Sequence, residues 1–233
     1  AMGNDDVSKS TMVDLVSLAP APAHDADIEF ELDTDLDGKA SRFGDRFWDF
    51  VLEKHKGLTD LLENEVIDRV QYSDRYFKTP MTVSLLLQVL KELDTRFPNS
   101  YNRAVATIRL EEITGDARRP SRAVWDDWDR SLARERAIEE AFEYVDLPVR
   151  VGTYERAHMP HSRTLDFEFS SGSTARIRLD EGWGYWETKS GYDSRFDFSA
   201  TPQQQGEKIA MWGGPLVRRR KRYRTAMTVS VRL

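Results

Sequence analysis

The sequence contains no cysteine and only four histidines, at positions 24, 55, 158 and 161. Without cysteine the chain can form no disulfide, no thiolate nucleophile and no cysteine-type zinc site. It also has no run of about 18 apolar residues and no basic stretch followed by an apolar leader. We therefore expect a soluble protein, and the absence of cysteine agrees with a reducing, cytoplasmic location.

Motifs for nucleotide chemistry are also missing. The stretch WGGP at 212–215 lacks the Lys and Ser/Thr that complete a phosphate loop, and no G-x-G-x-x-G follows a strand-like segment. The sequence has no Ser, His and Asp arrangement typical of a hydrolase. We expect no cofactor, and we do not expect this chain to hydrolyse nucleotides.

Charge is unevenly distributed along the 233 residues. Residues 1–40 hold ten acids and two bases, a net charge of −8, whereas residues 41–233 hold 30 acids and 32 bases, a net charge of +2. The acidic, turn-rich composition predicts a mostly flexible arm over 1–40, in which only IEFEL alternates like a strand. We expect one domain over 41–233. The opening Ala-Met-Gly is typical of a cloning remnant, so we expect a piece of a longer protein.

The order of apolar patterns predicts an α/β fold with a mixed β-sheet and flanking helices. Helical spacing begins at Phe43, EVIDRVQYSD is typical of a buried strand, and Pro80 begins a helix that ends before Pro98. A second strand over NRAVATIRLEEI precedes a long helix capped by Ser121. Short β-type runs follow, namely PVRVGTYE, RTLDFEFS, TARIRL, SRFDFSA and RTAMTVSVRL.

Two stretches carry a family resemblance, VIDRVQYSDRYFKTP and HSRTLDFEFSSGSTARIRLDEGWGYW. The matching positions are Asp74 and Tyr76 after a strand, His161 and Arg163 at the start of a hairpin, Gly172 in its turn, and Gly182, Tyr185 and Trp186 after it. Together they resemble the phospholipase D-like domain at the C-terminus of MIT-domain proteins, which also occurs in bacterial chains. The resemblance implies a phospholipase D-like fold over roughly residues 64–187. It extends to domains fused to helicase-like proteins of bacterial defence or DNA-modification systems.

The resemblance does not imply an active enzyme. Phospholipase D chemistry uses the signature His-x-Lys-x4-Asp twice, with one His as nucleophile and the other as acid. Here Arg163 replaces the lysine, Asp166 follows it after three residues, and no second copy exists. The family is a non-hydrolytic branch, although a homodimer could supply a second histidine across a two-fold axis. The acidic pair Asp180-Glu181 stands where the family has a base, which argues against anion binding at that turn.

Three interpretations of His161 remain open. In the first, the residue is part of a hairpin and Arg163 pairs with a carboxylate, either Asp74 or Glu168. The second is a phosphate site at the strand ends, made of His161, Arg163, Arg75 and Lys78. The third is a metal site with His158 and either Asp166 or Glu155, which we do not favour because Pro160 separates the two histidines.

The most basic run covers residues 218–224, in which six of seven side chains are positive: Arg218, Arg219, Arg220, Lys221, Arg222 and Arg224. As a strand it would present alternate arginines to a nucleic-acid backbone or an anionic membrane. Alternatively, it pairs with acids such as Asp126, Asp127 and Asp129, or holds the acidic arm. In the last case the arm would compete with a polyanionic ligand.

Two groups of aromatic residues are candidate binding elements. Trp125, Trp128 and Leu132 have helical spacing, which is more typical of a core stripe than of a base-stacking platform. Trp183, Tyr185 and Trp186 lie in a glycine-rich loop, where we favour packing against the sheet over exposure to a ligand.

Three functions follow from these observations. We favour a non-catalytic, phospholipase D-like binding or targeting module that recognises nucleic-acid phosphates or a partner protein within a larger bacterial machine. The second is a homodimeric, metal-independent phosphodiesterase or nuclease that uses His161. The third is an adaptor for an anionic membrane surface.

Overall fold

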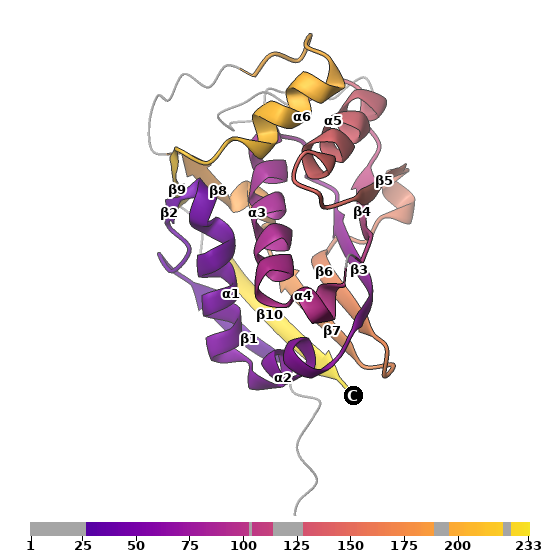
Figure 1. The fold of residues 1–233 in the computed structure, drawn as a ribbon. Coiled ribbons are helices and arrows are strands. Elements are labelled where there is room, and N and C mark those ends of the chain that lie inside the picture. The colour runs from indigo at the N-terminus through magenta and orange to yellow at the C-terminus, as the bar shows by residue number, and fades with distance from the viewer. Residues whose placement is uncertain (1–26, 103, 114–127, 189–195, 221–224) are drawn as a thin grey trace, which may run out of the picture.

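A mixed seven-stranded β-sheet forms the centre of the structure (Figure 1). The computed structural model describes residues 27–102, 104–113, 128–188, 196–220 and 225–233. In spatial order the strands are β1 (Ile28–Leu32), β10 (Thr225–Arg232), β7 (Thr174–Leu179), β6 (Arg163–Phe169), β3 (Ile67–Asp74), β4 (Ala106–Glu111) and β5 (Val149–Tyr154). β3, β4 and β5 are parallel, and each remaining neighbour is antiparallel. The predicted α/β class with a mixed sheet is confirmed.

A smaller antiparallel sheet stands beside the main one. Its order is β2 (Gly38–Lys39), β9 (Leu216–Arg219) and β8 (Trp186–Thr188). Three short 3₁₀ turns, η1 (Ala40–Arg42), η2 (Arg156–His158) and η3 (Trp183–Tyr185), lead into or out of strands.

The helices are α1 (Phe43–Lys54), α2 (Lys56–Asn64), α3 (Pro80–Arg96), α4 (Pro98–Tyr101), α5 (Ser131–Glu143) and α6 (Pro202–Ala210). Figure 1 shows α1, α3 and α4 lying over one face of the sheet. α3 is the central helix, and its residues from Pro80 to Leu87 are all buried, which explains its continuous apolar run. The predicted start at Pro80 is confirmed, and the Thr79 side chain caps the helix by accepting from the Thr82 N–H.

Side chains of the main sheet alternate between a helix-covered face and an exposed one. In β7, Ala175, Ile177 and Leu179 are buried, whereas the intervening Thr174, Arg176 and Arg178 are exposed. We call the exposed side the open sheet face. The strand period of two makes this division, because successive side chains point to opposite sides of the sheet.

The structure corrects the predicted boundary between arm and domain. Residues 28–32 form β1 and pair with β10, and the side chains of Leu32, Leu36 and Ala40 are buried. In the IEFEL segment the apolar residues face the core while the two glutamates stay exposed, so an acidic composition is compatible with a strand. The domain therefore includes 28–40, and residues 1–26 lie outside the described residues.

Two further element predictions are wrong in their described parts. The long helix predicted over 121–145 is present only as α5, which begins at Ser131. Trp128 lies before this start, and residues 114–127 lie outside the described range. Trp128 is buried against the Phe196 and Phe198 rings, and its indole N–H donates to Gln205. Leu132 is exposed, so it shares no core stripe with Trp128.

The described part of the predicted strand SRFDFSA, residues 196–200, forms no strand and turns at 198–200, and residues 194 and 195 lie outside the described range. The Asp197 carboxylate accepts hydrogen bonds from the N–H and hydroxyl of Ser199, a local pattern that replaces strand pairing.

Across the described ranges, none of the helices combines the length and the apolar character needed to cross a membrane.

Candidate functional site

Asp74 is the buried centre of the motif residues. It ends β3 and its side chain accepts two hydrogen bonds of 2.7 Å, one from the Tyr72 hydroxyl and one from the Tyr76 backbone N–H. Tyr72 and Asp74 are two residues apart in a strand, so both point to the helix-covered face. A carboxylate removed from water requires such donors. The Asp-x-Tyr motif therefore closes the turn after β3.

Arg163 completes this cluster from the first position of β6, which runs antiparallel beside β3. Its Nε lies 3.7 Å from Asp74 Oδ1, and its Cζ lies 4.6 Å from the centre of the Tyr76 ring. It also donates to the Asp180 carbonyl. The predicted pairing of Arg163 with Asp74 is thus confirmed, whereas Glu168 pairs with Arg69 at 3.1 Å. Arg163 is committed to contacts within the domain.

The glycines of the motif fit two different turns. Gly172 has a φ of +91° in the turn between β6 and β7, as predicted. Gly182 has a φ of +61°, and a Cβ at this position would lie 2.6 Å from Arg163 Cδ and 2.7 Å from Asp74 Oδ2. Both its backbone angle and its close packing require glycine.

The aromatic residues after Gly182 belong to the core. Trp183, Tyr185 and Trp186 are each at most 3% exposed. The ring of Phe43 from α1 makes edge contacts with both indoles, at centroid distances of 5.7 Å and 5.1 Å. The favoured prediction of packing is confirmed, and these three residues offer no free face for a base.

Burial raises the pKa of Asp74 above its ordinary value of 3.8, and this effect exceeds the opposing hydrogen bonds from Tyr72 and Tyr76 and the charge of Arg163. Because the folded chain holds the Asp74 proton more tightly than the unfolded chain does, protonated Asp74 stabilises the fold. This contribution to the free energy of unfolding is complete below pH 3.8 and is lost as the pH rises through the raised pKa.

A substitution of Asp74 by Asn tests this pKa. We expect the stability of the wild-type protein relative to Asp74→Asn to fall as the pH is raised from about 4 to about 7, because only the wild type must ionise the buried group. Urea unfolding of both proteins across this pH series measures the difference. A difference that does not change with pH would show that the folded and unfolded chains share one pKa at Asp74.

Above the buried cluster, the end of β3 presents an exposed aromatic pair. The Tyr76 side chain is 41% exposed, and the His161 ring centre lies 6.4 Å from its ring. Arg75 donates to the carbonyls of Met159, at 3.0 Å, and Arg156, at 3.1 Å, which holds η2 beside this turn. We define the Tyr76 surface as Arg75, Tyr76, Lys78, Arg156 and His161. It lies at the carboxyl end of a parallel strand, where α/β sheets commonly bind ligands.

Two arginines in the described part of the basic run pair with acids, as one of the interpretations predicted, and Asp126 and Asp127 lie outside the described residues. The Arg218 guanidinium lies 3.2 Å from the Glu187 carboxylate, and the backbone N–H of Arg219 donates to the Asp37 carboxylate at 2.8 Å. The Arg219 side chain pairs with Asp33. The interpretation that the run holds the acidic segment is confirmed for Arg219, since β9 also pairs with β2. Arg220 follows the end of β9, so it does not extend the predicted arginine ladder, and Lys221, Arg222 and Arg224 lie outside the described residues.

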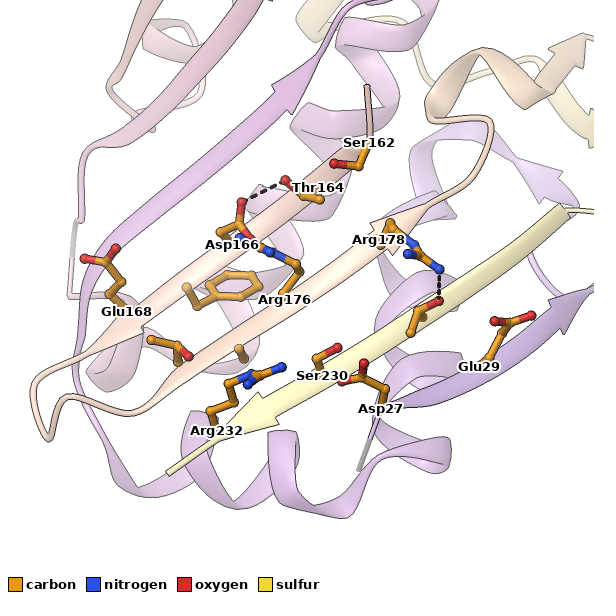
Figure 2. A pocket seen from close by; sticks show the side chains of 14 residues that line it. Asp27, Glu29, Ser162, Thr164, Asp166, Glu168, Arg176, Arg178, Ser230 and Arg232 are labelled. Atoms are coloured by element: carbon orange, nitrogen blue, oxygen red, sulfur yellow. Dashed lines mark hydrogen bonds and ion pairs between the residues drawn. The ribbon is translucent and has the colours of Figure 1, made fainter. Parts of the chain in front are cut away.

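A second candidate surface is a hollow of about 580 Å³ on the open sheet face (Figure 2). Its charged lining consists of four acids and three arginines, namely Asp27, Glu29, Asp166, Glu168, Arg176, Arg178 and Arg232. Arg176 pairs with Asp166, and Arg178 donates to the Thr228 hydroxyl at 3.1 Å. Mixed charges paired across neighbouring strands favour a solvated face over a site for a polyanion.

Sequence reasoning missed the open sheet face, and although it allowed the basic run to hold the acidic arm, it did not single out Arg219 or the 33–37 segment. The alternation in TARIRL does indicate the first, because every second residue is polar. The second had no comparable signal, since the paired residues are about 180 positions apart. Among the described residues, no group of three or more histidines or carboxylates lies together as a potential metal site.

The comparisons with known proteins agree with a helicase-associated domain. No curated protein matches the chain. A family model described as the C-terminal domain of the DEAD/DEAH box helicase YjiV matches residues 26–231, which includes β1 and ends in β10. The match spans most of the 233 residues, so the chain belongs to this family of helicase C-terminal domains.

Proposed function

We propose that this domain is a non-catalytic, phospholipase D-like module that binds the nucleic acid on which its helicase-like parent acts. The observation that carries the proposal is the Tyr76 surface, where an exposed tyrosine ring lies beside His161 on a turn that also carries Arg75 and Lys78 and is bonded to the Arg156 carbonyl. Cations contact phosphates and exposed rings contact bases, so this combination suits nucleic acid better than a small anion.

The committed contacts of Arg163 support a binding role over a catalytic one. In a phospholipase D mechanism, the residue two positions after the histidine must hold the phosphoryl oxygens. Arg163 is instead held by the buried Asp74 carboxylate, the Asp180 carbonyl and the Tyr76 ring. Releasing it would leave Asp74 without its ion-pair partner, which is costly for a buried group. His161 makes no hydrogen bond or ion pair with the other described residues.

The charged part of the surface is expected to contact phosphates. Lys78 follows Tyr76 by two residues, and Arg75 ties the segment that carries Arg156 to this turn through the Arg156 carbonyl. Two phosphate contacts would make binding fall with salt, with a slope of about 0.9 for each phosphate neutralised. Arg163 donates to the carbonyl of the acidic residue Asp180, which Glu181 follows, so we expect phosphates to contact Lys78 and Arg156 rather than this acidic turn.

The proposal predicts that changing both Lys78 and Arg156 to Ala weakens binding of a labelled DNA oligonucleotide about tenfold, and lowers the salt slope by about two. Fluorescence polarisation at about 50 mM and about 200 mM salt measures both quantities. The matched control changes Arg176 and Arg178 to Ala, which removes the same charge from the open sheet face. Equal losses in the two double variants would reduce the effect to net charge, and the absence of DNA binding by the wild type would reject the proposal.

The same titration separates the alternatives. Cleavage of the oligonucleotide that disappears in His161→Ala would identify a nuclease, with a second copy of the chain supplying the other histidine. Binding to anionic vesicles in the absence of DNA binding would identify a membrane adaptor. If neither ligand binds, a partner protein becomes the remaining target.

A further inference from the structure

The Tyr76 ring is held in place before any ligand arrives. Its backbone N–H is bonded to Asp74, and the Arg163 guanidinium covers one side of the ring at 4.6 Å. Arg163 in turn packs against Gly182, whose missing side chain leaves room for it. A ring fixed in this way loses little conformational freedom when a second flat group stacks on it.

The ring remains accessible even though it is anchored. Tyr76 is 41% exposed, whereas Tyr72, which lies four residues earlier in β3, is 1% exposed. His161 is also exposed, and its ring lies at 60° to the Tyr76 ring, so the two do not cover each other by stacking. Their open edges and faces form a step of two aromatic rings.

Such a step distinguishes between forms of nucleic acid. In a duplex the faces of the bases are stacked on one another, and a protein reaches only phosphates and base edges. In a single strand each base has a free π-face that can stack on an aromatic side chain, whatever its sequence. The cations of the Tyr76 surface would then contact the phosphates of the same strand.

From this geometry we infer that the Tyr76 surface binds single-stranded nucleic acid, with one unpaired base stacked on the Tyr76 ring and His161 at its edge. The inference rests on the proposed function and adds the form of the ligand. It assigns Tyr76 to stacking and Lys78 and Arg156 to phosphate contacts. Arg163 is a positioning residue that fixes the ring.

The test compares a single-stranded oligonucleotide with the duplex of the same sequence, using wild type, Tyr76→Ala, Tyr76→Phe and Tyr144→Ala. We expect the wild type to bind the single strand more tightly, and Tyr76→Ala to lose about tenfold for the single strand with little change for the duplex. Tyr76→Phe keeps the ring and should keep most of the affinity. Tyr144 is 53% exposed at the end of α5, so its removal controls for the loss of an exposed tyrosine elsewhere.

Several outcomes would overturn the inference. Equal or tighter binding of the duplex would contradict the preference for a single strand, and an equal loss for both ligands in Tyr76→Ala would contradict stacking. A single strand of abasic sites that binds as well as the intact strand would do the same. In each of these cases DNA still binds, so the proposed function stands, whereas a wild type that binds neither form rejects both. Thermal unfolding of each variant confirms that the domain is folded.

Discussion

Substitution of Asp74 by Ala is expected to lower the free energy of unfolding by about 3 kcal/mol or more. The carboxylate is 2% exposed and holds the Tyr72 hydroxyl, the Tyr76 N–H and the Arg163 guanidinium in one place. Its removal leaves a cation with 13% exposure next to an empty space. Loss of one partner of a buried pair costs more than the pair contributes, because the remaining charge stays desolvated.

Urea unfolding measures this loss, and Asp166 supplies the matched control. Asp166 also pairs with an arginine, but the Arg176 side chain is 62% exposed, so Asp166→Ala should cost less than about 1 kcal/mol. If Asp74→Ala does not fold, the double variant with Arg163→Met removes both charges and should recover part of the stability. Similar losses in the two aspartate variants would mean that the Asp74 cluster is no more important than a surface pair.

Substitution of Gly182 by Ala is expected to cost about 3 kcal/mol through two additive causes. The backbone at this residue, with φ of +61° and ψ of −165°, lies in a region that only glycine adopts readily. The new Cβ would also lie 2.6 Å from Arg163 Cδ and 2.7 Å from Asp74 Oδ2, which no side-chain carbon tolerates. The buried ion pair would have to move.

Two other glycines separate these causes in the same unfolding experiment. Gly172→Ala carries the backbone cost alone, about 1 kcal/mol, because its φ is +91° and no atom lies within 4 Å of the added Cβ. Gly184→Ala has open space around the added Cβ and no left-handed φ, so its stability should change least of the three. If all three variants lose equally, close packing against Arg163 does not explain the need for Gly182.

The motif residues therefore have two separate consequences. Asp74, Arg163 and Gly182 form a buried cluster that joins the ends of β3 and β6 to the turn before η3. Tyr76 and His161 lie at its exposed edge. Variants of Tyr76 and His161 can test binding without changing the buried cluster, whereas variants of Asp74, Arg163 or Gly182 would also move the Tyr76 ring.

Local patterns predicted much of the fold. The apolar run of α3 is long, and Thr79 with Pro80 marks the helix start from local chemistry alone. Ile67, Val70 and Tyr72 mark β3 as a strand because their side chains favour β structure. The alternation in β7 and β10 likewise specifies strands with one covered face. By contrast, Trp128 has helical spacing in the sequence but lies before α5, because burial against Phe196 and Phe198 stabilises it outside the helix.

The roles of charged residues could not be predicted from the sequence in the same way. The sequence by itself determined that Asp74, His161 and Arg163 stand at strand ends and that the C-terminal part is rich in arginine. Only the tertiary structure decided that Arg163 is committed to Asp74, that Arg219 holds the 33–37 segment, and that Tyr76 stays exposed. The physical reason is range: helix and strand formation depends on neighbours within a few residues, whereas an ion pair depends on distances between segments far apart in the chain. Residues of the same type therefore become buried, paired or exposed only when the fold places their segments next to one another.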